Sequence, residues 1–193
     1  AALVDIDADG DLDLYLAQNF FGPQAETGRM AGGLSLLLAG DGRGGFDPVW
    51  PKDSGLIVPG DARSLSVTDL DGDGWVDFVV GINDASPVAF RNGIGERVAA
   101  GTRMLAVQLA GSAANPGAIG ARVRLLHADG GAQTAELRAG GGYLSQSAPV
   151  LRFGIPKGGA VERIEVRWPD GTTTEHPAPD PVARTVTLRR PGD

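Results

Sequence analysis

The chain has 193 residues, no cysteine and a formal net charge of −7, and 42% of its residues are hydrophobic. These values predict a folded protein with a packed core, and they exclude disulfides, thiol catalysis and cysteine-ligated zinc. No apolar run approaches the ~18 residues needed to cross a bilayer, so we expect no membrane insertion.

Charge divides the chain into two regions. Residues 1–96 contain 16 acidic and 5 basic residues (−11), whereas residues 97–193 contain 8 and 12 (+4), which sums to −7. We therefore predict two domains, residues 1–101 and 102–193. The acidic first half argues against nucleic acid as a partner and in favour of cations.

Two nine-residue acidic windows, Asp5–Asp13 and Asp69–Asp77, repeat at an offset of 64 residues (69 minus 5). Both read D-x-D-x-D-G-x-x-D, and the likeness continues into the apolar residues that follow. Two copies in register indicate an internal repeat.

So many carboxylates in so short a loop repel one another unless a cation neutralises them. Calcium takes about 6–8 oxygen ligands in flexible geometry, and glycine at position 6 (Gly10, Gly74) permits the sharp reversal that such a loop needs. We predict two Ca²⁺ sites. The candidate ligands are the carboxylates of Asp5, Asp7, Asp9, Asp13, Asp69, Asp71, Asp73 and Asp77, with the position-7 carbonyls of Asp11 and Trp75.

An EF-hand would need a glutamate at position 12 and flanking helices. Position 12 is Leu16 in one loop and Val80 in the other, and the residues after each loop favour strands. We therefore reject the EF-hand. A magnesium site and a pair of solvated Asp-Gly turns remain as alternatives.

Residues 40–45 satisfy G-x-G-x-x-G, the pattern of a dinucleotide-binding loop. That loop requires a helix directly after it, but Pro48 and Pro51 follow within six residues. We predict a turn.

The two loops, with the later segments Leu34–Phe46 and Val88–Gly95, resemble FG-GAP/VCBS-type repeats. The resemblance covers residues 1 to about 97 and implies calcium-loop blades of a β-propeller. Two repeats cannot close a ring of about 4–8 blades, so we expect an incomplete propeller and a chain that is the C-terminal part of a longer protein. The first repeat carries an insertion, Phe20–Gly33, to which the sequence assigns no function.

In the second half, residues 119–126 and 161–168 alternate apolar and polar residues with the period of strands, and short apolar runs and turn residues mark the rest. Seven strands are predicted, at residues 104–109, 119–126, 132–138, 150–153, 161–168, 172–176 and 185–190. The predicted fold class is thus all-β, with propeller-type repeats followed by a β-sandwich-like domain.

Residues 102–176 resemble the ASPIC/UnbV domain. The resemblance is carried by Asn115–Val123, Gly140–Ser147, Phe153-Gly154 and Ile164–Gly171. It implies an extracellular or envelope setting and binding more than catalysis, and it supplies no activity.

Catalytic groups are sparse in this half. There is no nucleophile elbow, and His127 and His176 are expected at the surface. Gly140–Ser147 is either a glycine-permitted bend or part of a polar ligand patch formed by Arg138, Tyr143, Ser145 and Gln146. Trp168 is expected in the core.

We therefore expect a calcium-binding, non-catalytic adhesion or ligand-recognition module, located extracellularly, in the periplasm or at the cell envelope. Its partner would be a protein or a glycan. Two alternatives remain: an accessory region of a secreted carbohydrate-active or biosynthetic enzyme, and a catalytic C-terminal domain of an unfamiliar kind.

Overall fold

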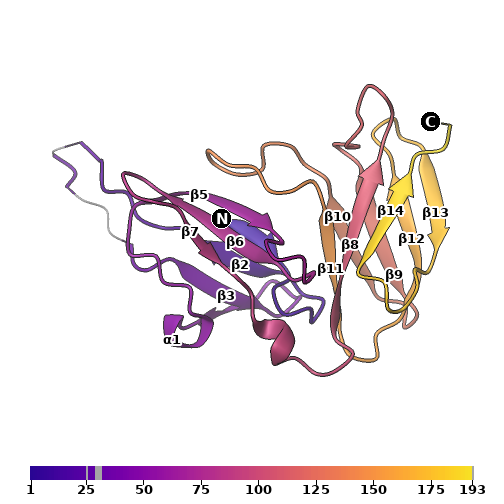
Figure 1. Cartoon of the computed structure of the whole chain (residues 1–193), viewed down its shortest axis with the longest axis horizontal. Coiled ribbons are helices and arrows are strands. Elements are labelled where there is room, and N and C mark those ends of the chain that lie inside the picture. The colour runs from indigo at the N-terminus through magenta and orange to yellow at the C-terminus, as the bar shows by residue number, and fades with distance from the viewer. Residues whose placement is uncertain (25, 29–31, 193) are drawn as a thin grey trace. The chain divides into compact units, whose positions relative to one another are not determined.

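The computed structural model describes residues 1–24, 26–28 and 32–192. These residues form fourteen strands, the short helix α1 (Pro51–Ser54) and the 3-10 helix η1 (Ile94–Glu96), so the all-β prediction is confirmed (Figure 1). Within the described ranges, no helix is long and apolar enough to cross a membrane.

The chain divides into two compact units. Unit 1 comprises residues 1–6, 11–93 and 140–148, and unit 2 comprises residues 7–10, 94–139 and 149–193. A single boundary near residue 101 stays a prediction. Unit 2 includes residues 7–10 from the first half of the chain, and unit 1 includes residues 140–148 from the second half.

Unit 1 contains two antiparallel sheets. The first has the order β1 (Ala2–Val4), β2 (Asp13–Leu16), β3 (Leu36–Gly40) and β4 (Phe46–Val49). The second has the order β5 (Ala62–Thr68), β6 (Asp77–Ile82) and β7 (Val88–Phe90). Each acidic loop connects the first strand of its sheet to the second, so the sequence repeat is also a repeat of strand order. The loops lead into strands and not into helices, in agreement with the rejection of an EF-hand.

Aromatic packing joins the two sheets of unit 1. The rings of Tyr15 on β2 and Phe78 on β6 stack with centroids 4.9 Å apart and planes inclined by 28°. Both side chains are buried, together with Val58, Val76 and Val80. This core fixes the strands that follow the two acidic loops.

The glycine-rich segment 40–45 is the turn between β3 and β4, which pair from Gly40↔Phe46 onward. The carboxylate of Asp41 accepts hydrogen bonds from the backbone N–H groups of Arg43 and Gly45, both at 2.8 Å. The prediction of a turn in place of a nucleotide loop is confirmed.

Residues 140–148 cover the free edge of β5. The Ser145 hydroxyl donates to the carbonyl of Leu65 (2.8 Å), and the N–H of Val67 donates to the Ser147 hydroxyl (3.1 Å). The N–H of Ala148 donates to the carbonyl of Val67 (3.2 Å). An edge strand with unpaired backbone groups invites pairing with other chains, and this segment satisfies those groups.

Unit 2 contains the seven strands predicted from the sequence. One sheet has the order β10 (Ala132–Glu136), β9 (Arg122–His127), β12 (Val161–Arg167) and β13 (Thr173–Pro177). The other has the order β11 (Leu151–Ile155), β8 (Arg103–Ala110) and β14 (Thr185–Arg189), in which β14 runs parallel to β8.

A single core lies between these two sheets. It includes Leu105 and Phe153 from one sheet and Leu125 and Val166 from the other. Trp168 belongs to the same cluster with 1% of its surface exposed, as expected. Unit 2 is therefore sandwich-like.

Candidate metal centre

The structure gathers three carboxylates in each acidic loop. The groups are Asp5, Asp7 and Asp13 in the first loop and Asp69, Asp71 and Asp77 in the second, and each residue offers one oxygen within 4.8 Å of the other two. These are positions 1, 3 and 9 in both copies. The second loop lies wholly within unit 1.

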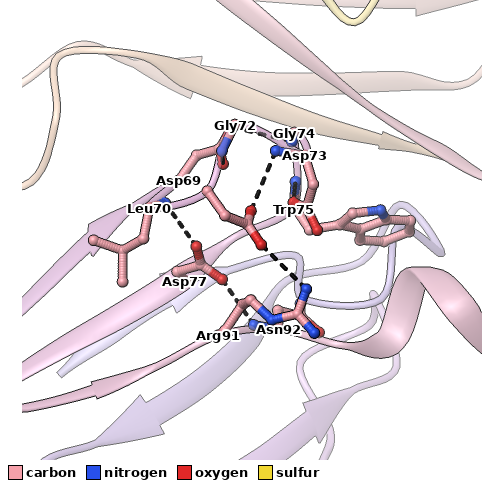
Figure 2. Close-up of polar contacts among 10 residues, drawn as sticks. Asp69, Leu70, Gly72, Asp73, Gly74, Trp75, Asp77, Arg91 and Asn92 are labelled. Carbon is pink, nitrogen blue, oxygen red and sulfur yellow. Dashed lines mark hydrogen bonds and ion pairs between the residues drawn. The ribbon is translucent and has the colours of Figure 1, made fainter.

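The position-9 aspartates are buried in both loops. Asp77 is 0% exposed, and its two oxygens accept hydrogen bonds from different backbone N–H groups, those of Leu70 and Asn92, each at 2.7 Å (Figure 2). These bonds tie the start of the loop to the segment after β7. The sequence pointed to Asp77 only as the residue that closes the site.

Positions 1 and 3 accept hydrogen bonds from other groups. Asp69 accepts from the N–H groups of Gly72 (2.8 Å) and Gly74 (3.0 Å), so its carboxylate holds the loop in a tight turn. Asp71 faces the guanidinium of Arg91 at 3.1 Å, a contact in which both side chains are partly exposed. Sequence reasoning missed Arg91 and Asn92, although both lie in the segment Val88–Gly95 that carries the repeat resemblance.

Backbone conformation explains the glycine at position 6. Gly10 and Gly74 have φ of 100° and 93°, a region that favours glycine. Position 4 is left-handed as well, but there the first loop has Ala8 (φ 60°) where the second has Gly72 (φ 77°). The two loops share one path even where their sequences differ.

Electrostatic crowding is visible in the second loop. Burial raises the pKa of Asp73, and the nearby carboxylates of Asp71, Asp77 and Asp69 raise it further, against a hydrogen bond from the N–H of Trp75. The pKa of Asp71 is lowered, mainly by the hydrogen bond from Arg91. The loop thus concentrates negative charge, part of which the guanidinium of Arg91 offsets at Asp71.

The donor set fits a hard divalent cation. All the grouped side chains offer carboxylate oxygen, the ligand that Ca²⁺ and Mg²⁺ prefer. Oxygens bound to one Ca²⁺ at about 2.3–2.6 Å lie at most about 5 Å apart. The oxygens of each group, all within 4.8 Å of one another, fall inside this limit.

The remaining predicted ligands lie outside the two groups found among the described residues; they are Asp9, Asp11, Asp73 and Trp75. The Asp11 carboxylate lies so close to Gly42 that a Cβ at that glycine would clash with it. The carboxylate of Asp73 accepts from the N–H of Trp75 at 2.9 Å. Their assignment as ligands stays a prediction.

The predicted ligand patch is divided between the two units. Tyr143, Ser145 and Gln146 lie in unit 1, whereas Arg138 lies in unit 2 and pairs with Glu136 at 3.4 Å. Ser145 is engaged with Leu65, and Gln146 accepts from the N–H of Gly140 at 3.2 Å. Tyr143 is 70% exposed. The bend interpretation therefore has direct structural support, and ligand binding by these residues stays a prediction.

Comparisons with known proteins agree with both resemblances. Residues 5–80 match the family model described as FG-GAP-like repeat, and residues 111–193 match the model described as ASPIC and UnbV. Each match overlaps the segment that carries the corresponding resemblance.

Curated relatives carry the name Cartilage acidic protein 1. The human protein (Homo sapiens) is 37% identical over 130 residues, the mouse protein (Mus musculus) 36% over 130, and the frog protein (Xenopus tropicalis) 34% over 124. Each match covers 60% of this chain but only 18% of the relative.

Proposed function

We propose that this chain is a calcium-binding, non-catalytic recognition module of an extracellular protein, with a protein or a glycan as its partner. The observation that carries the proposal is the recurrence of the same three-carboxylate group at positions 1, 3 and 9 of two loops 64 residues apart (69 minus 5). A chance cluster of solvated acids would not recur with the same buried, doubly hydrogen-bonded member.

The FG-GAP-like match supports the calcium assignment, and neither matched family is named for a catalytic activity. The relatives' name supports the extracellular setting.

Calcium would act by stabilising the folded loops. A ligand that binds only the folded state stabilises it by RT ln(1 + [L]/Kd), about 2.7 kcal/mol at 100 times Kd. Extracellular calcium modules have Kd of roughly 10⁻⁴–10⁻³ M, so such sites fill outside cells and stay empty in a cytosol. Asp69, Asp71 and Asp77 would hold the ion in the second loop. The two loops would thus be stabilised by the ion only where calcium is abundant.

Isothermal titration calorimetry with CaCl₂ and MgCl₂ tests this proposal. We expect two calcium sites per chain and weaker binding of magnesium. Asp71→Asn and Asp7→Asn should each remove one site, because each deletes an exposed or partly exposed member of one group. Asp53→Asn, in α1 and outside both loops, makes the same charge change and should keep two sites. Absence of saturable calcium binding, or equal loss with Asp53→Asn, would overturn the assignment.

A further inference from the structure

The outer face of the four-stranded sheet in unit 2 is ordered in rows of charged residues. One row contains Arg124 on β9 and Glu165 on β12, which are register partners and form an ion pair at 3.3 Å. Glu175 on β13 lies opposite Glu165, and Arg163 contacts both glutamates, at 3.3 and 4.0 Å. Arg163 also contacts Glu162 at 2.6 Å. Every charge in this row therefore has an opposite charge in contact with it.

The next row, two residues along the strands, has an excess of positive charge. Arg122 on β9 lies directly opposite Arg167 on β12, and Glu136 on β10 lies opposite Arg122. Glu136 contacts Arg122 at 3.9 Å and also Arg138 at 3.4 Å. Arg122 and Arg138 thus share one carboxylate, and Arg167 adds a further positive charge beside them. Like charges directly opposite on neighbouring strands are destabilising unless something offsets them.

Arg167 is the unmatched member of this row. Its register partners are Arg122 on one side and Thr173 on the other. Within the described part of the chain, the acidic residues that pair with Arg122, Arg138 and Arg190 form no ion pair with Arg167. The two acidic residues nearest in sequence are engaged by other arginines: Glu165 by Arg124 and Arg163, both at 3.3 Å, and Asp170 by Arg190 at 2.7 Å.

A hollow of about 220 Å³ lies where this charge accumulates. Its lining consists of Gly120, Arg122, Glu136, Arg167, Trp168, Pro169 and Gly171. Gly120 and Gly171 have φ of 91° and 89°, so two left-handed turns form part of the wall and add no side chains to it. This volume is below the roughly 300–1,000 Å³ of pockets that hold drug-sized ligands. It therefore suits a small molecule that carries one acidic group.

We propose that this hollow binds an oxyanion, namely the carboxylate, sulfate or phosphate group of a small ligand, between Arg122 and Arg167. Guanidinium groups present forked N–H donors that match such oxyanions, and an anion there would offset the like-charge pair. Glu136 limits the charge of the site and competes with the ligand for Arg122. The site lies wholly in unit 2, so it does not depend on the calcium proposal.

Titration of the ¹⁵N-labelled full chain at constant ionic strength tests this site. Sodium sulfate and sodium glucuronate are the probes, and sodium chloride is the reference salt. We expect saturable shifts of the amide signals of Gly120 and Gly171 with the oxyanions but not with chloride. Tighter binding of glucuronate than of sulfate would identify an acidic sugar as the ligand class. Equal binding of the two would indicate that the hollow binds a simple oxyanion.

Substitutions on the same sheet face provide the controls. Arg167→Gln should weaken binding about tenfold or more, because it removes charged hydrogen bonds to the ligand. Arg124→Gln, two residues from Arg122 on β9 but in the row whose charges are all paired, should leave binding within about twofold. Glu136→Gln should strengthen it, which a purely structural role of this row does not predict. No saturable shift beyond that of chloride, or equal loss in the two arginine variants, would overturn the proposal.

Discussion

Asp13 and Asp77 make the same pair of hydrogen bonds at equivalent places in the two repeats. Each accepts one N–H from position 2 of its own loop, Ile6 at 2.9 Å or Leu70 at 2.7 Å. Each accepts another at the end of the third strand of its sheet, from Gly40, the last residue of β3, at 3.0 Å or from Asn92, two residues after β7, at 2.7 Å. Position 9 therefore holds the loop to the end of the sheet whether or not it also binds an ion.

The first prediction separates this structural role from metal binding. In Asp77→Asn the amide nitrogen cannot accept a hydrogen bond, so the buried N–H of Leu70 or Asn92 loses its partner. We expect a loss of about 1–3 kcal/mol in the free energy of unfolding, measured by urea denaturation in EDTA. Asp71→Asn should lose little in EDTA, because Asp71 is exposed. Equal stability of Asp77→Asn and the natural chain in EDTA would contradict the structural role.

Arg91 is predicted to compete with the cation for Asp71. Its guanidinium contacts Asp71 at 3.1 Å and offsets part of the loop charge. Arg91→Gln should therefore lower the melting temperature slightly in EDTA, since exposed pairs contribute about 0.2–1 kcal/mol, and should increase the stabilisation by calcium. Thermal melts with and without CaCl₂ measure both effects. A smaller calcium effect in the variant would show that Arg91 supports the ion.

Much of this arrangement follows from local sequence. The D-x-D-x-D-G spacing specifies a loop with left-handed glycines, and the alternation of apolar and polar residues indicated β9 and β12, two of the seven strands of unit 2. The Trp168 side chain also lies in the core as its strand pattern indicates. These features depend on residues close in sequence. There, backbone sterics determine the loop conformation, and the period of the side chains determines which residues face the core.

Features that depend on distant contacts were not predictable. The segment 140–148 has the composition of a flexible bend, and only the fold brings its serines to the edge of β5, about 80 residues away in sequence. Ala8 adopts a φ of 60° that its residue type does not favour, because the loop around it imposes the path. The like-charge pair of Arg122 and Arg167 appears only once the strand register is known.

A buried ion pair in unit 1 was also absent from the sequence-based expectations. Asp61 is 2% exposed and contacts Arg63 through two nitrogens, Nε at 2.8 Å and Nη2 at 2.9 Å. The Arg63 guanidinium also lies 4.3 Å from the centroid of the Phe20 ring. This places the start of the Phe20–Gly33 insertion in contact with β5.

We predict that Arg63→Met lowers the free energy of unfolding by about 3 kcal/mol, because it leaves a buried carboxylate without its cation. The double variant Asp61→Asn/Arg63→Met should be more stable than the sum of the two single changes implies, since it removes both charges together. Urea denaturation of the four proteins in this double-mutant cycle gives the coupling. Strict additivity would mean that the pair does not contribute as a unit.

The serines at the edge of β5 supply a fourth prediction. Ser147→Ala leaves the N–H of Val67 without its acceptor, so the amide proton of Val67 should exchange with solvent more than about tenfold faster. Hydrogen exchange followed by NMR measures this rate directly. Ser86→Ala, an exposed serine in the same unit, serves as the control. An unchanged exchange rate of Val67 would contradict the interpretation that Gly140–Ser147 covers the edge of β5, and the ligand-patch interpretation would then be preferred.

The last prediction concerns pH and His176. The indole Nε1–H of Trp168 donates to the Thr174 hydroxyl at 2.9 Å, and that hydroxyl lies 2.9 Å from Nε2 of His176. The Thr174 oxygen has two lone pairs, so beside the bond from Trp168 it can either donate its own hydrogen to Nε2 or accept one from an Nε2–H, depending on the tautomer of the ring. Burial lowers the pKa of His176, in agreement with a neutral ring.

This arrangement fixes the sign of the pH dependence. With the folded-state pKa below the unfolded value of about 6.5, the unfolded chain binds more protons in this range. Stability should therefore fall as pH drops below about 6.5, and the loss should level off below the folded-state pKa. Urea denaturation between pH 7.5 and pH 5 should show a shallower decline for His176→Gln than for the natural chain. Identical slopes for His176→Gln and the natural chain would show that the Trp168–Thr174–His176 chain does not couple to folding.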